Sequence, residues 1–72
     1  MESKIKMRVV NTVSCCDESG KRVVIMSGEC AIEVTHDNIY IHWKDQYGNT
    51  HRGILTNVDY AQYLNVKHLI PI

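Results

Sequence analysis

The sequence predicts a mainly β domain built from an antiparallel meander. Two observations support this: apolar residues recur at every second position along several stretches, and short turn-forming pairs separate these stretches. In Lys4–Val9 the cations fall on one face, while Ile5, Met7 and Val9 fall on the other, which is the pattern of a half-buried strand. The segment Ser14–Gly20 is rich in turn-forming residues and predicts a loop.

Turn-forming pairs set the register expected for the meander. The pairs are Ser27-Gly28, Asp37-Asn38 and Gly48-Asn49. Each contains residues that suit a tight two-residue hairpin. If all three form such hairpins, one row of apolar residues crosses four strands on a single face: Val23, Ile32, Trp43 and Ile54. A shift of one residue would move a whole strand's apolar set to the wrong face, so the agreement supports this register and a central position for Trp43.

The periodicity changes after the meander. Asn57 is a suitable N-cap, and Asp59 would stand in the first helical turn. Apolar residues then recur at helical spacing at Val58, Ala61 and Leu64. The spacing predicts one short helix near residues 57–64, followed by a terminal strand that Pro71 confines to an edge or a fraying end.

The order of these elements is strand, loop, meander, short helix and terminal strand, which is similar to that of SH3-like small barrels. The expected fold is therefore a single mainly β domain over residues 1–72, an antiparallel meander forming an SH3-like small barrel or a strongly twisted sheet. The resemblance is one of element order. The "ALYDY" stretch and the peptide-groove aromatics of SH3 domains are absent, so no functional residue is transferred.

Composition narrows the classes of function. A chain of 72 residues buries only ~60% of the surface that its unfolded form exposes, so its core is small. Eight Lys and Arg balance eight Asp and Glu, whereas nucleic-acid binders usually carry a basic excess. No apolar run reaches the ~20 residues of a membrane helix, and three cysteines are an odd count for a disulfide framework. We expect a cytoplasmic protein with reduced thiols and no membrane partner.

Neither a metal site nor a catalytic site is predicted, and no cofactor is expected. Zinc sites use paired ligands at short spacing, but Cys15 and Cys16 are adjacent and the other candidate ligands are scattered. These others are Cys30, His36, His42, His51 and His68. The residues offer two candidate catalytic assemblies: Cys15 or Cys16 with His36 and Asp37, and Glu29 or Glu33 with His42. A small sheet excludes little water, so we expect a protein that is not an enzyme.

The predicted register places a mixed apolar and basic surface around the Gly48-Asn49 hairpin, with His42, Lys44 and His51 pointing outward. Such exposed patches mark partner surfaces. The predicted partner-binding residues are Tyr40, His42, Lys44, His51, Arg52 and Leu55. The alternative is a small-barrel DNA- or RNA-binding protein that uses the cations of the first strand, Lys4, Lys6 and Arg8.

The function expected from these features is that of a non-enzymatic interaction or regulatory protein that binds a larger protein. By analogy, small chains without an enzyme motif are often accessory or inhibitor proteins of phages, plasmids or bacteria. A homo-dimer or higher oligomer is also expected, because the first and last strands need closing partners.

Overall fold

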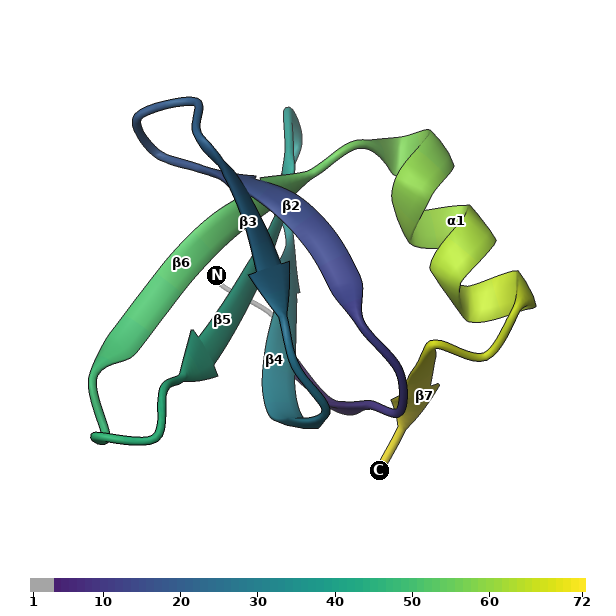
Figure 1. Ribbon diagram of the computed structural model, residues 1–72. Helices are drawn as coiled ribbons and strands as arrows, with labels where there is room; N and C mark the ends of the chain where they lie inside the picture. The colour runs from purple at the N-terminus through teal and green to yellow at the C-terminus, as the bar shows by residue number, and fades with distance from the viewer. Residues whose placement is uncertain (1–3) are drawn as a thin grey trace.

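A computed structural model describes residues 4–72 (Figure 1). Over these residues the strands form one antiparallel sheet in the order β3-β2-β6-β5-β4-β1-β7, curled into a half-barrel, with a short helix beside it. The elements are β1 (Lys4–Val9), β2 (Val13–Asp17), β3 (Arg22–Ile25), β4 (Gly28–Val34), β5 (Ile39–Lys44), β6 (Thr50–Leu55), α1 (Asn57–Asn65) and β7 (Leu69–Pro71). This confirms the prediction of a mainly β small barrel or twisted sheet with one short helix.

The first four strands form one long, bent hairpin. β2 pairs with β3 so that Val13 lies opposite Ile25, and β1 pairs with β4 so that Val9 lies opposite Gly28. The predicted hairpin at Ser27-Gly28 is therefore wrong, because this segment is a bend between β3 and β4, which are not paired. Val23 faces Cys15 and not Ile32. In this arrangement each of the four strands contributes side chains to the core.

Two loops share the pattern Asp-x-x-Gly. They connect β2 to β3 (Asp17–Lys21) and β5 to β6 (Asp45–Asn49). In each loop the aspartate amide donates to the carbonyl of the residue four positions later, and the glycine amide donates to the aspartate carbonyl. Gly20 and Gly48 have φ values of 88° and 84°, a left-handed conformation that glycine adopts without strain. These are three-residue hairpin loops with a left-handed last residue. The predicted loop at Ser14–Gly20 is wrong over its first half, because β2 continues to Asp17.

The length of each loop decides on which side of the sheet the side chains of the next strand lie. The β4–β5 loop turns at His36-Asp37 and not at Asp37-Asn38, since the Thr35 amide bonds the Asn38 carbonyl. The register there shifts by two residues, so every β5 side chain keeps its predicted face. At the next loop the shift is three residues, an odd number, because Trp43 lies opposite His51 and not Ile54. All β6 side chains therefore face the opposite way from the prediction.

The core lies on the concave side of the curled sheet. Its buried members come from all seven strands of the described chain. They are Met7, Val9, Val13, Cys15, Ile25, Cys30, Ile32, Ile39, Ile41, Leu55 and Leu69. Trp43 is only half-buried and packs against the edge of this cluster, so its predicted central position is wrong. Ile32 and Ile41 face each other across β4 and β5 at the centre, both without exposed surface.

The helix packs against the open side of the half-barrel. Its N-cap is Thr56, whose hydroxyl accepts a hydrogen bond from the Asp59 amide at 3.1 Å, so the cap lies one residue before the predicted Asn57. The packed face is formed by Tyr60, Tyr63 and Leu64, whereas the predicted contact residue Val58 is exposed. The spacing correctly predicted the helix and the packing of Leu64 but wrongly included Val58 and Ala61, because the aromatic side chains of Tyr60 and Tyr63 bury more apolar area.

Hydrogen bonds connect this helix and the segment after it to β2 and to the segment between β1 and β2. The Tyr63 hydroxyl accepts from the Ser14 amide at 3.0 Å, and the Val10 amide donates to the His68 carbonyl at 2.8 Å. β7 then pairs with β1 at the sheet edge, where Pro71 is tolerated as predicted. The first and last strands therefore close on each other.

Gly53 is a packing requirement of the fold. A β-carbon at this position would lie 2.5 Å from the Cys15 sulfur and 3.1 Å from the Cys16 carbonyl oxygen. We predict that Gly53→Ala destabilises the protein by about 1–3 kcal/mol through overpacking. In a Cys15→Ala background the same change should cost less, because the sulfur is gone. Chemical denaturation of the four proteins of this double-mutant cycle measures the difference, and strictly additive effects would contradict the contact.

Candidate functional site

The candidate site is the outer face of the sheet, the convex side opposite the core. Cross-strand register places its side chains in rows over β1, β4, β5 and β6. The first row holds Lys4, Glu33, Tyr40 and Ile54, the second Lys6, Ala31, His42 and Arg52, and the third Arg8, Glu29, Lys44 and Thr50. Lys4, Lys6 and Arg8, predicted as nucleic-acid contacts, thus share one continuous face with Tyr40, His42, Lys44 and Arg52 of the predicted partner-binding set.

The structure gathers four of the predicted partner-binding residues and excludes two. Tyr40, His42, Lys44 and Arg52 lie on the outer face. His51 and Leu55 face the concave side. The loop between Asp45 and Asn49 has three residues and not two, so the β6 side chains lie on the side of the sheet opposite to the predicted one. Leu55 is only 2% exposed and belongs to the core, so both residues are removed from the candidate site.

Some cations on the outer face are already paired. Arg52 contacts Glu18 at 2.7 Å, and its guanidinium lies 4.7 Å from the centre of the Tyr40 ring. Arg8 lies 3.8 Å from Glu29. Such exposed pairs contribute little to stability, but they reduce the charge that is available to a ligand.

Three lysines remain available for a ligand. Within residues 4–72, no carboxylate lies within ion-pair distance of Lys4, Lys6 or Lys44. Lys6 and Lys44 both belong to the lining of a single hollow. The cations that could meet an anionic partner are therefore concentrated over β1, β4 and β5.

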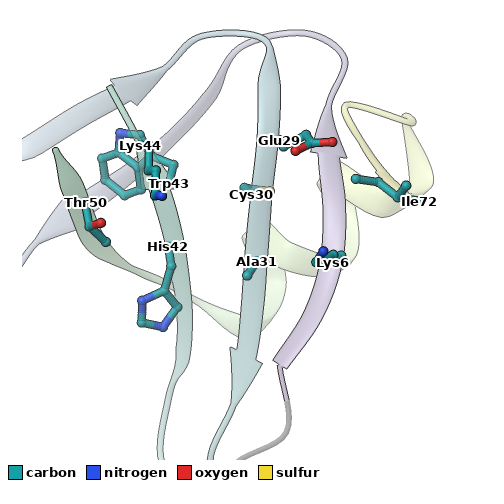
Figure 2. Close-up of a pocket in the computed structure, with 9 residues that line it drawn as sticks. All are labelled: Lys6, Glu29, Cys30, Ala31, His42, Trp43, Lys44, Thr50 and Ile72. Carbon is teal, nitrogen blue, oxygen red and sulfur yellow. The ribbon is translucent and has the colours of Figure 1, made fainter. Parts of the chain in front are cut away.

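An open hollow of about 510 Å³ lies over Ala31 (Figure 2). Ala31 is the small residue of its row, between Lys6 on β1 and His42 on β5. Lys44, Glu29 and Ile72 complete the polar and apolar rim. The predicted partner-binding residues do not include Ala31, Glu29 or Ile72, since no pattern in the chain indicates that β1 pairs with β4 and β7 with β1.

Glu33 and His42 form a partly buried pair on this face. The Glu33 carboxylate accepts a hydrogen bond from Nε2 of His42 at 2.9 Å, and their side chains are 9% and 18% exposed. The two residues are diagonal neighbours, since Glu33 lies opposite Tyr40 and His42 opposite Ala31. The pair supplies the polar partner that a buried carboxylate needs and holds the His42 ring beside the hollow.

A second aromatic and polar cluster lies on the concave side, at the β5–β6 hairpin. The His51 ring stacks on Trp43 with centroids 5.5 Å apart, and its Nε2 donates to Asp45 Oδ2 at 2.8 Å. Asp45 Oδ1 accepts the amides of Tyr47 and Asn49, both at 2.9 Å. These bonds, led by that from His51, lower the pKa of Asp45 to about 2. The cluster stabilises the loop whose length decides on which side of the sheet the β6 side chains lie.

The cysteines differ from the prediction that both Cys15 and Cys16 are loop thiols. Cys15 is buried in β2, and only Cys16 is exposed. Burial, with smaller contributions from Cys16 and Asp17, raises the pKa of Cys15 to about 11. Burial also raises the pKa of Cys30 to about 11. A buried thiol that stays protonated at neutral pH is a poor nucleophile, which argues against Cys15 as the nucleophile of the assembly with His36 and Asp37.

In the part of the chain that the structure describes, no three His, Cys, Asp or Glu side chains are grouped to hold a metal ion. Its helix is too short to cross a membrane. No protein-family model, curated protein or solved structure matches this chain.

Thiol reactivity tests the new position of β2. We predict that a thiol reagent labels the folded protein first at Cys16, while Cys15 and Cys30 react much more slowly because burial keeps them protonated. Mass spectrometry of digests over time measures the order. Denatured protein is the control and should lose the difference, whereas equal early labelling of Cys15 and Cys16 would contradict the burial of Cys15.

Acid titration tests the Asp45 cluster. Because its folded pKa is lowered from 3.8 to about 2, the carboxylate stabilises the fold fully above pH 3.8, and this contribution disappears as the pH falls to about 2. We predict that Asp45→Asn lowers stability at neutral pH and flattens its pH dependence in that window. Denaturation midpoints between pH 2 and 5 measure the effect. Asp37→Asn is the control, and a variant curve parallel to the wild-type curve would contradict the account.

Proposed function

We propose that this chain is a non-enzymatic protein-interaction module whose outer face binds an acidic segment of a partner protein. The observation that carries the proposal is the hollow over Ala31, which has a small apolar floor and is flanked by Lys6 and Lys44. An interface of this kind combines an apolar contact with a polar rim. Within residues 4–72 neither lysine has an ion-pair partner, so a carboxylate of the partner can supply one.

The polar pairs next to the hollow support a binding surface whose side chains are held in place before a partner binds. Glu33 holds His42, and Arg52 lies against both Glu18 and Tyr40, so these side chains lose little freedom when a partner binds. Preorganised side chains reduce the entropy lost on association. A regulatory or accessory role in the cytoplasm remains part of this proposal.

A nucleic-acid ligand is the second candidate. It is favoured by one observation, the placement of five cations on a single face: Lys4, Lys6, Arg8, Lys44 and Arg52. It is opposed by the pairing of Arg8 and Arg52 with glutamates and by the zero net charge. The Arg52 guanidinium also lies over the Tyr40 ring, on which a base could otherwise stack.

The test begins by capturing a partner from native lysate and then measures its affinity for purified variants. We predict that Lys6→Gln with Lys44→Gln weakens binding by about tenfold or more, because truncated basic anchors cost ~1–4 kcal/mol at such interfaces. The matched control is Lys21→Gln with Lys67→Gln, which makes the same change in net charge at exposed sites away from the hollow. Both variants should keep the wild-type thermal midpoint.

Two results would overturn the proposal. Equal affinities of the two double variants would move the binding surface away from the hollow. Tight binding of single-stranded DNA or RNA at low salt, with a steep loss of affinity as salt rises, would favour the nucleic-acid candidate.

A further inference from the structure

β3 is an edge strand with one unpaired side. Among the described strands only β2 pairs with it, and it ends the strand order of the sheet. The Asp17 amide bonds the Lys21 carbonyl at 2.8 Å, which makes this a hydrogen-bonded pair of the β2–β3 ladder. Because such pairs alternate along an antiparallel ladder, Val23 and Ile25 direct their backbone groups to β2. The backbone groups of Arg22 and Val24 therefore point away from the sheet.

The opposite edge is not equivalent. β7 is short and contains Pro71, which has no amide hydrogen to donate. The Ile72 amide is directed inward and bonds the Lys6 carbonyl at 3.3 Å. A head-to-tail contact between β3 of one copy and β7 of the next is therefore disfavoured, and open-ended assembly by that route with it.

The β3 edge is short, but the strand carries no lysine, proline or bulge. Its exposed side chains include Val24 and, directly after the strand, Met26, which are 55% and 70% exposed. Arg22 at the start of the strand is the only charged residue of β3. Edges that must stay unpaired usually carry lysine, proline or a bulge. Tyr47, 80% exposed, lines the same open hollow as Val24 and Met26 and adds apolar surface beside the edge.

We propose that β3 pairs antiparallel with β3 of a second copy of this chain, with the two Val24 residues opposite each other on a two-fold axis. In this register Arg22 of each copy lies opposite Met26 of the other. The outward-directed backbone groups of the two Val24 residues then bond each other, and those of Arg22 face Met26 of the other copy, which extends the pairing one residue beyond β3. Like charges are kept apart, and Val24 and Met26 of the two copies form one apolar strip.

The sequence of the edge favours this register over its neighbour. Moving the axis to Val23 would pair Arg22 with Val24 of the other copy and leave Met26 without a cross-strand partner. An axis between Val23 and Val24 would oppose outward-directed residues to inward-directed ones, so the hydrogen bonds could not form. Because the pairing is two-fold and self-complementary, it closes as a dimer.

The pairing strand β3 does not line the hollow over Ala31, although the hollow beside the β3 edge shares Glu29, Trp43 and Lys44 with it. The inference does not rest on the proposed function, because it depends only on the backbone edge and side chains of β3. A strand of four residues buries little area, and interfaces below ~1,200 Å² are weak. We expect dissociation in the range of ~10–500 μM. The predicted oligomer is thus retained as a proposal, but the strand assigned to it changes from the terminal strands, which pair with each other, to β3.

Sedimentation of the full chain over ~5 μM to 1 mM tests the proposal, a range that brackets the expected dissociation constant. The wild-type protein should shift from monomer to dimer. Val24→Lys and Val24→Glu should each remain monomeric, because two like charges would meet at the axis. An equimolar mixture of the two variants should recover the dimer, since lysine then faces glutamate. The matched control, Val58→Lys on the exposed face of α1, should dimerise like the wild type.

Several outcomes would overturn this inference. One is a strict monomer of the wild-type protein throughout the range. Another is a dimer that either charged variant forms as well as the wild type. Stronger dimerisation of Val24→Glu alone would place Val24 opposite Arg22 of the other copy and contradict the Val24 axis. All variants should show wild-type circular dichroism, which separates loss of pairing from loss of folding.

Discussion

The three-residue loop between β5 and β6 is the constraint on which the two faces of this protein depend. Gly48 takes a left-handed conformation that closes the loop, and Asp45 binds the amides of Tyr47 and Asn49 together with the His51 ring. A loop one residue shorter or longer would turn every β6 side chain to the other side of the sheet. Leu55 would then leave the core, and Arg52 would leave the outer face.

The same loop type appears between β2 and β3 and has a related consequence. Asp17 Oδ1 accepts hydrogen bonds from the Ser19 hydroxyl and from the amides of Lys21 and Ser19, and these bonds, led by that from the hydroxyl, lower the pKa of Asp17. The loop joins β2 to the edge strand β3, and β2 lies between β3 and β6, where Cys15 packs over Gly53. Two short polar loops thus specify a core whose apolar side chains alone would allow several registers.

The sequence supports the fold class well and the pairing of strands poorly. Alternation along β1, the helix near residues 57–64 and the edge position of Pro71 are local features, and all three are found in the structure. The Ser27-Gly28 hairpin is wrong because a local turn signal cannot show that β3 pairs more extensively with β2. The predicted orientation of the β6 side chains is wrong because the prediction assigns Gly48 to a two-residue turn, whereas the loop has three residues. The repeated Asp-x-x-Gly pattern in the sequence could have indicated the longer loop.

Predictions for the site followed the same physics. His42 and Lys44 kept their predicted face because the register shift before β5 is even, while His51 and Leu55 changed sides because the next shift is odd. β1 pairs with β4, a strand that is distant in sequence, and this pairing places Lys4, Lys6 and Arg8 beside these residues. A pattern of alternation cannot reveal such a contact, so the hollow over Ala31 could be found only in three dimensions.

The most direct test of the account is the β5–β6 register in solution, measured by nuclear Overhauser effects between α-protons of the two strands. In antiparallel sheets these contacts are strongest at pairs that are not hydrogen-bonded, where the α-carbons are ~4.5 Å apart. Since Asp45 and Asn49 form a hydrogen-bonded pair, the account predicts strong contacts between His42 and Arg52 and between Tyr40 and Ile54. A contact between the α-protons of His42 and Leu55 in their place would contradict it.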